Sequence, residues 1–269
     1  MTQEPVATIG KDTPRWIRFE HGGKSGFGTL EDDTITVHEG EMFASPSASG
    51  ETLSLADVTV LTPCVPKKMI ALWNNFHALA EKLSMPEPEE PLYFIKTDNS
   101  YLASGQVIRR PNAYSGKVVY EGEIGIVIAK ECKEVSEDDA DDYIFGYTCI
   151  NDVTAVELID KDPTFAQWVR SKSFDTFGVF GPVIATGINP DNLSIKTVLN
   201  GQERQNYPVS DMILGPRLIV SRLSHDMTLH PGDVICCGTS LGVGSMKEPS
   251  NTIEVSIEGI GTLSNTFVQ

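Results

Sequence analysis

The chain has 269 residues, of which 40% are hydrophobic, and its formal net charge is −16 at pH 7. This length suits one large domain or a main domain with a small appendage, and no apolar run approaches the roughly 18 residues of a membrane span. Nucleic acid and anionic membranes are poor partners for so negative a surface, so neither is expected as a partner.

The N-terminus and the cysteines indicate a cytoplasmic protein. The stretch MTQEPVATIGKDTPRW lacks the basic and then apolar segments of a signal peptide. The five cysteines are odd in number and form no CxxC pair, which favours reduced thiols. Cys236 and Cys237 lie in an apolar run, and core packing is expected for both.

The first part of the chain predicts a small β unit. Residues 15–38 alternate apolar and polar side chains and contain turn sequences, as a β-meander does. Residues 43–55, FASPSASGETLSL, are rich in Pro, Ser and Gly and predict a connector. These patterns divide the chain into an N-terminal β domain with its connector, residues 1–62, and a second domain, residues 63–269.

The rest of the chain predicts a mixed α+β fold that is rich in strands. Strands outnumber helices and regular βα repeats are few, which argues against a doubly wound sheet. Strands are predicted at 67–73, 92–96, 106–111, 118–130, 144–153, 181–186, 193–201, 233–239 and 252–267. Helices are predicted at 74–84, near 136–143, over most of 154–170 with a break at Pro163, and near 216–224.

Three carboxylates are candidates for a metal site. Glu121 and Glu123 are two apart in the predicted strand 118–130, so both point to the same side with Cα atoms about 6–7 Å apart. Asp152 ends another apolar strand and could supply a third oxygen ligand for a hard cation such as Mg²⁺ or Mn²⁺. Taken singly, the two glutamates could instead be a solvent-facing edge, and Asp152 could be a helix N-cap.

Two further motifs lie downstream. WVRSKSFDTFG contains Lys172, and LHPGDVICCGTSLGVG contains a glycine-rich loop around Thr239. Alone, Lys172 could be a surface lysine and the loop only a loop, since it is not a phosphate-binding GxxxxGK[ST] sequence. No strand-linked GxGxxG is present, which disfavours a nicotinamide or pyridoxal phosphate enzyme.

The motifs in order are YEGEIGIVI, GYTCINDVTA, KSFDTFGVFGPVI, LNGQERQ, TLHPGDVICCGTSLGVG and IEGIGTL. As a set they resemble the fumarylacetoacetate hydrolase (FAH) superfamily over about residues 67–269, and the front part resembles the N-terminal unit of its smaller members. The resemblance implies a β-rich mixed-sheet fold, a homodimer, and bound Mg²⁺ or Mn²⁺. It also implies roles for individual residues: metal ligands Glu121, Glu123 and Asp152, catalytic Lys172 and Thr239, and Gly238 as a substrate contact in the glycine-rich loop.

The resemblance implies chemistry on 2-oxo or 2,4-dioxo acids. A divalent ion would chelate neighbouring carboxylate and keto or enolate oxygens and stabilise the charge that develops there. Lysine would add a positive charge and a proton donor or acceptor. This step serves hydrolytic C–C cleavage, keto–enol isomerisation and decarboxylation alike.

The sequence departs from the family in the segment that precedes strand 92–96. Hydrolytic members carry N-Y-x-x-H-x-x-E, in which the histidine and glutamate activate water. Alignment puts Leu79 and Lys82 at those two positions. His77 and Glu81 lie four apart and would share a helix face, so they form either a displaced catalytic dyad or a surface pair.

A second departure follows Asp152. Family members often read N-D-x-S-A-R-D-x-Q, whereas Val156 and Ile159 replace the arginine and glutamine here. The substrate therefore lacks a second carboxylate or another cation contacts it. Arg170, Lys96 and Arg109 are candidates for that cation, although each taken alone is more typical of a surface charge. Val156 predicts a more apolar pocket.

The leading prediction is metal-dependent hydrolysis of a C–C bond in an acylpyruvate-type substrate. The alternative within the superfamily is a 2-hydroxy-dienoate isomerase, oxaloacetate-type tautomerase or decarboxylase. A hypothesis of another class is a catalytically silent binding protein that keeps the metal-site scaffold.

Overall fold

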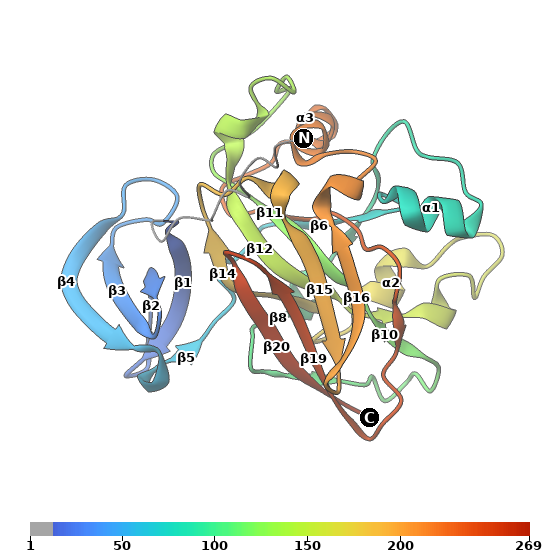
Figure 1. Ribbon diagram of the computed structural model, residues 1–269, viewed down its shortest axis with the longest axis horizontal. Coiled ribbons are helices and arrows are strands. Elements are labelled where there is room, and N and C mark those ends of the chain that lie inside the picture. Colours follow the sequence, from blue (N-terminus) through green and yellow to red (C-terminus); the bar gives the residue numbers. More distant parts are fainter. Residues whose placement is uncertain (1–12) are drawn as a thin grey trace, which may run out of the picture.

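The computed structural model describes residues 13–269. The N-terminal stretch that lacks a signal-peptide pattern lies mostly in residues 1–12, outside this range. The described chain is dominated by strands, which confirms the predicted α+β class (Figure 1). Within residues 13–269 no helix is both long and apolar enough to cross a membrane.

A twelve-stranded mixed sheet runs through the whole molecule. Its order is β4-β3-β2-β1-β14-β12-β11-β17-β6-β7, with β5 paired to β1 and β8 paired to β14. The strands of the main body are β6 (Met69–Trp73), β7 (Leu92–Lys96), β8 (Tyr101–Leu102), β11 (Gly122–Ile128), β12 (Ile144–Asp152), β14 (Gly178–Ala185) and β17 (Val234–Cys236).

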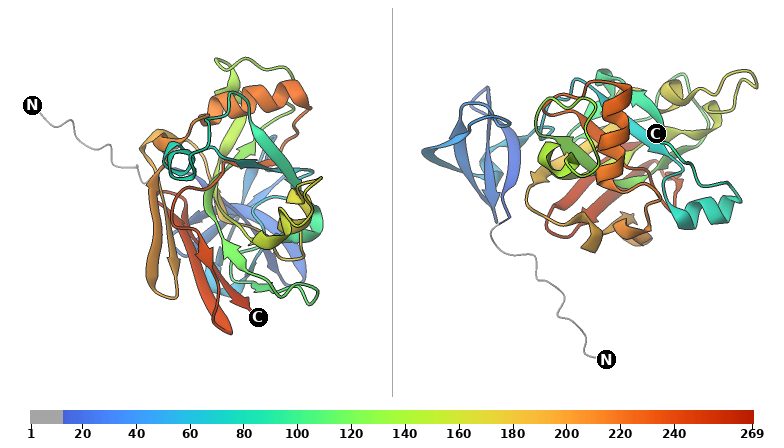
Figure 2. Two further views of the ribbon diagram at one scale, coloured as in Figure 1. Left: turned by 90° about the vertical axis from the view of Figure 1, so that its right-hand side faces the viewer. Right: turned by 90° about the horizontal axis from the view of Figure 1, so that it is seen from above.

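The N-terminal strands form the predicted meander and stand as a lobe beside the main body (Figure 2). They are β1 (Arg15–His21), β2 (Lys24–Glu31), β3 (Thr34–Glu39), β4 (Ser47–Ser54) and β5 (Thr59–Val60). Because β1 also pairs with β14, the lobe continues the large sheet, and the domain boundary at residue 62 stays a prediction.

The prediction of a connector at residues 43–55 is wrong over most of its length. Residues 47–54 form the edge strand β4, which pairs with β3. Its side chains are almost all exposed, so the strand needs no apolar alternation and the sequence pattern could not reveal it.

A five-stranded sheet packs against the large one. It has the order β16-β15-β19-β20-β9 and contacts β11, β12 and β14. Its strands are β9 (Val107–Arg109), β15 (Ser194–Leu199), β16 (Gln202–Pro208), β19 (Ser250–Ile257) and β20 (Gly261–Val268). Strand β16 was not predicted, because its polar side chains show little apolar alternation.

The predicted strand 118–130 is broken at Glu121. β10 (Val118–Tyr120) belongs to a separate three-stranded sheet with β13 (Thr154–Ala155) and β18 (Gly244–Ser245), whereas β11 belongs to the large sheet. The chain therefore changes sheets at Glu121, and this bend takes the place of the continuous period-two strand.

The helices are α1 (His77–Leu83), α2 (Trp168–Lys172) and α3 (Pro216–Asp226), and α1 and α2 lie at the end opposite the N-terminal lobe (Figure 1). Most of the predicted helix 154–170 is absent, since residues 154–158 form β13 and a 3₁₀ turn and α2 begins only at Trp168. Asp162 accepts hydrogen bonds from the backbone and hydroxyl of Thr164, a local turn that competes with a helix.

The acidic segment near 136–143 forms only a 3₁₀ turn, Ala140–Tyr143, instead of the predicted helix. The other 3₁₀ turns are Leu55–Asp57, Asp98–Ser100, Val156–Leu158, Pro190–Asn192 and Val209–Asp211.

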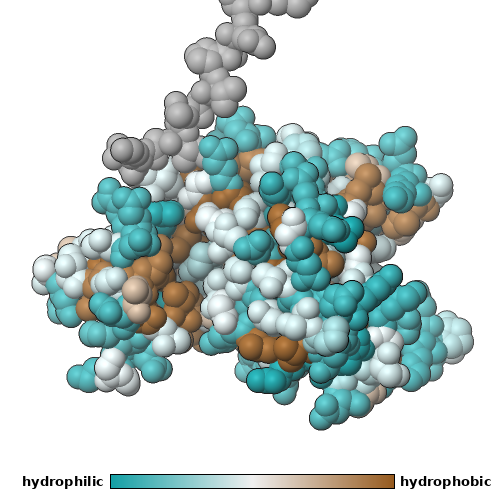
Figure 3. Space-filling model, turned by 60° about the horizontal axis from the view of Figure 1, so that its bottom comes forward, coloured by the Kyte–Doolittle hydropathy of each residue, from teal (hydrophilic) through white to brown (hydrophobic). Residues whose placement is uncertain are grey.

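Apolar side chains on the face shown in Figure 3 form separate patches among polar ones, in keeping with the acidic composition.

All five cysteines are free and buried, as predicted for reduced thiols in the core. Cys236 and Cys237 are both fully buried, which confirms their packing role. Burial raises the pKa of Cys64 and of Cys149 to about 12, so neither thiol ionises at neutral pH.

Candidate metal centre

The three predicted carboxylates meet in the structure. Glu121 occupies the bend between β10 and β11, Glu123 lies in β11, and Asp152 ends β12. One oxygen of each lies within 4.8 Å of the others. The backbone N–H of Asp152 donates to the carbonyl of Glu121 at 2.9 Å, which ties the strand end to the bend.

These carboxylates are neither a solvent-facing edge nor a cap. Glu121, Glu123 and Asp152 are 9%, 1% and 0% exposed. The Asp152 carboxylate bonds lysines, so the N-cap alternative is wrong. Gly122, between the two glutamates, permits β11 to pack closely on β15, because a Cβ there would lie 2.0 Å from the Thr197 hydroxyl oxygen.

Two buried lysines neutralise part of the cluster. Lys172 donates to Glu121 Oε2 at 2.8 Å and to Asp152 Oδ2 at 2.6 Å. Lys96 donates to the other oxygen of Asp152 and to the carbonyl of Lys172. The surface-charge alternative is therefore wrong for both lysines, which are 2% and 1% exposed.

The charges set the protonation of the cluster. Burial first, and then the neighbouring Asp152, raise the pKa of Glu123 well above its usual range. Burial disfavours the charged form of Asp152, but Lys172 and Lys96 lower its pKa overall. Burial likewise opposes the charge of Lys172, yet Asp152, Glu121 and Glu123 raise its pKa above the ordinary value.

The donor set fits a divalent cation. Glu123 Oε1 is buried and has no hydrogen-bond partner within residues 13–269, which is costly unless another group satisfies it. Three carboxylates against two ammonium groups also leave a net negative charge in a dry interior when all are ionised. Oxygen ligands of this kind suit Mg²⁺ and Mn²⁺.

The glycine-rich loop holds the cluster from one side. The N–H of Gly238 donates to Glu123 Oε2 at 2.9 Å, and the Thr239 hydroxyl donates to the carbonyl of Gly122 at 2.9 Å. Gln205 in turn donates to Thr239. In this structure Gly238 and Thr239 therefore contact the carboxylate strand directly.

Sequence reasoning missed four polar residues around the cluster. Thr154 donates to Glu121 Oε1 at 2.8 Å, and Tyr207 donates to the Gly122 carbonyl. Gln205 orients Thr239, and the buried Ser240 hydroxyl has no partner among the described residues. Thr154, Gln205 and Ser240 belong to motifs that contributed to the family resemblance, but no role was assigned to them. Tyr207 lies outside those motifs, and nothing in the sequence singled it out.

The predicted pair of His77 and Glu81 does not form here. His77 Nδ1 lies 2.6 Å from Glu87 Oε1 on the surface, and Glu81 is exposed. Leu79, at the position of the usual histidine, packs against the core. No hydrogen bond or ion pair joins any of the five histidines, all within residues 13–269, to the three carboxylates.

Within residues 13–269, no hydrogen bond or ion pair joins the other predicted substrate contacts, Arg170, Arg109 and Val156, to the carboxylates. Arg170 and Arg109 are exposed, as expected for surface charges. Val156 is half-buried in the 3₁₀ turn, where its N–H donates to the Lys117 carbonyl. Their roles toward substrate stay predictions.

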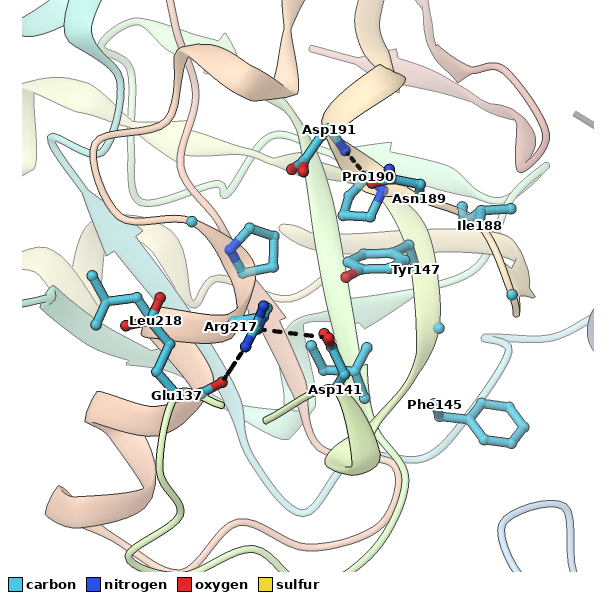
Figure 4. A pocket seen from close by; sticks show the side chains of 15 residues that line it. Glu137, Asp141, Phe145, Tyr147, Ile188, Asn189, Pro190, Asp191, Arg217 and Leu218 are labelled. Atoms are coloured by element: carbon cyan, nitrogen blue, oxygen red, sulfur yellow. Dashed lines mark hydrogen bonds and ion pairs between the residues drawn. The ribbon is translucent and has the colours of Figure 1, made fainter. Parts of the chain in front are cut away.

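A separate cavity of about 530 Å³ lies at the start of β12 (Figure 4). Arg217 crosses it to bond the Glu137 carbonyl and pair with Asp141. Tyr147, which lines it, stands five residues before Asp152, or about 16 Å along a strand. This cavity is therefore not the entrance to the carboxylate cluster.

Fold and cluster together define a mixed-sheet protein with a buried carboxylate–lysine centre. Residues 68–268 match the model of the fumarylacetoacetate (FAA) hydrolase C-terminal family, and residues 15–63 match the Rv2993c-like N-terminal family. The chain belongs to the fumarylacetoacetate hydrolase family and is an enzyme of that superfamily.

Among curated proteins, an uncharacterised protein of Archaeoglobus fulgidus is 43% identical over 94% of this chain and 95% of its own. Oxaloacetate tautomerase YisK of Bacillus subtilis is 34% identical over 79% of this chain and 74% of its own.

Among solved structures, 2-hydroxyhepta-2,4-diene-1,7-dioate isomerase of Mycobacterium marinum is 35% identical with a TM-score of 0.86, covering 95% of this chain and 98% of that one. Maleylpyruvate hydrolase of Sphingobium, solved with manganese(II) and pyruvate, is 26% identical with a TM-score of 0.76, covering 95% and 99%.

Proposed function

We propose that this protein is a divalent-metal-dependent isomerase or tautomerase, which interconverts the enol and keto forms of a 2-oxo acid. The observation that carries the proposal is the pairing of Lys172 with Glu121 and Asp152, in a site where no histidine of residues 13–269 hydrogen-bonds or ion-pairs with a carboxylate. A proton-transfer reaction needs the lysine, whereas hydrolysis also needs a group that activates water.

Mg²⁺ or Mn²⁺ would bind to Glu121, Glu123 and Asp152. The buried Glu123 oxygen that has no partner within residues 13–269 supports this assignment. When bound, the ion would withdraw electron density from the carboxylate and 2-oxo oxygens of the substrate. Lys96 keeps Asp152 and the end of α2 in place through its two hydrogen bonds.

Lys172 would move the proton. As an ammonium group it delivers a proton to C3 of the enol, while the enol O–H proton leaves to solvent and C2 becomes a carbonyl. Solvent then reprotonates the neutral amine, so no atom is gained or lost. Burial opposes the charge of Lys172, but Asp152 and Glu121 raise its pKa, which favours the ammonium form that this direction needs.

Hydrolytic C–C cleavage is the second candidate. The similarity to maleylpyruvate hydrolase of Sphingobium favours it. It would require His77 and Glu81, or the observed pair of His77 and Glu87, to reach the site after a movement of α1.

On family resemblance alone we also propose a homodimer.

Turnover of 2-oxo acids tests the proposal. With Mg²⁺ or Mn²⁺ present, the protein should accelerate the enol–keto conversion of oxaloacetate. The loss of absorbance of the enol measures this rate. Lys172→Met should lower kcat at least a hundredfold, and Lys117→Met, an exposed lysine, serves as control. His77→Ala with Glu81→Ala should leave the rate unchanged.

Other outcomes would contradict the proposal. Release of pyruvate and carbon dioxide from oxaloacetate would indicate decarboxylation. Cleavage of an acylpyruvate that is lost in the variant without His77 and Glu81 would establish hydrolysis. An unchanged rate of enol–keto conversion in Lys172→Met would show that Lys172 is not the proton carrier.

A further inference from the structure

An apolar groove of about 400 Å³ lies at the β7 edge of the large sheet. Residues with uncharged side chains line it: Trp73, Pro91, Leu92, Tyr93, Phe94 and Trp168. Leu92 and Tyr93 are 45% and 38% exposed, so the groove opens to solvent.

Strand register puts the groove on the same face of the sheet as the carboxylates. Gly125 of β11, Cys236 of β17, Ala71 of β6 and Phe94 of β7 are successive partners across four strands. Side chains two positions away along each strand share that face.

Glu123 on β11, Trp73 on β6 and Lys96 on β7 are those positions. Glu123, Trp73 and Lys96 therefore project from one face. The contacts of Lys96 with Asp152 and Lys172 agree with this register.

A chain of rings links the groove to the proposed proton carrier. Lys172 Nζ lies 5.3 Å from the centroid of the Phe94 ring. That ring stacks on Trp168 at 5.6 Å, and Trp168 lies 5.1 Å from Trp73. Trp168 and Lys172 are four residues apart on α2 and share a helix face. Phe94 therefore both lines the groove and lies beside the proposed proton carrier.

We propose that this aromatic groove binds the end of the substrate remote from the 2-oxo acid, and that this end is apolar or aromatic. The inference rests on the proposed function and adds the substrate class. Aromatic walls bind a flat apolar group by stacking and burial, and they offer no cation for a second carboxylate. Val156 and Ile159 likewise supply no charged or amide group after Asp152.

Phenylpyruvate and oxaloacetate are matched probes, since one carries an aromatic ring and the other a second carboxylate on C3. In the wild type, kcat/KM for enol–keto conversion should be higher for phenylpyruvate. Trp73→Leu and Trp168→Leu should each lower the ratio of kcat/KM for phenylpyruvate to kcat/KM for oxaloacetate about tenfold. Trp73→Phe, which keeps an aromatic ring, should keep most of the wild-type ratio. Trp16→Leu, which changes a tryptophan of the N-terminal lobe, should leave the ratio unchanged.

Binding gives a readout that does not depend on turnover. Phenylpyruvate should quench tryptophan fluorescence saturably in the wild type and in Trp16→Leu, and much less in the variant lacking both Trp73 and Trp168. Quenching without turnover of either acid would uphold the groove and overturn the proposed reaction. Two results would contradict the proposed role of the groove and leave the proposed reaction standing. One is turnover of oxaloacetate with no quenching by phenylpyruvate, and the other is a kcat/KM ratio that neither Trp73→Leu nor Trp168→Leu changes.

Discussion

At the scale of single residues, the site depends on side chains that are unfavourable unless they meet. Three buried carboxylates repel one another, and two buried ammonium groups cost desolvation energy. Their contacts within one cluster offset these costs, and the proposed cation would satisfy the Glu123 oxygen that has no partner within residues 13–269. The cluster is therefore understandable only as a set.

Gly122, which lies between the two glutamates, lets β11 pack closely on Thr197 of β15. In Gly122→Ala the new Cβ would lie 2.0 Å from Thr197 Oγ1, so the free energy of unfolding should fall by about 1–3 kcal/mol. Urea denaturation measures this loss. Thr197→Ala removes an oxygen that has no hydrogen-bond partner within residues 13–269. The double variant should therefore be more stable than Gly122→Ala, and equal stability of Gly122→Ala and wild type would contradict the close approach.

At the scale of elements, apolar strands were predictable and polar ones were not. Strands β7, β11 and β12 contain the apolar runs that the sequence shows, so Glu123 and Asp152 could be assigned to strands. Strands β4 and β16 form by backbone pairing alone and carry no such signal. The helix predicted over 154–170 fails because Asp162 and Pro163 favour a turn.

Backbone protection should follow the position of each strand in its sheet. β4 is an exposed edge strand, whereas β11 is buried and paired on both sides. Hydrogen–deuterium exchange read by mass spectrometry should therefore show residues 47–54 exchanging much faster than residues 122–128. Equal protection of the two peptides would mean that β4 is covered in solution.

At the scale of the whole molecule, the site was predictable where its residues lie in linked motifs. Glu121, Glu123, Asp152 and Lys172 belong to such motifs. The burial of Lys96 was not predictable, because its partners lie 56 and 76 residues away and meet it only through sheet pairing. The same holds for the groove, whose tryptophans come from β6 and α2.

The central claim is that the three carboxylates bind one divalent ion, and a titration with Mn²⁺ followed by electron paramagnetic resonance tests it most directly. The account predicts one Mn²⁺ per chain in the wild type and in Glu258→Gln, an exposed control. Affinity should be at least tenfold weaker in Glu123→Gln, which keeps the shape of the side chain but loses its charge. No stoichiometric binding to the wild type, or equal affinity in Glu123→Gln, would contradict the account.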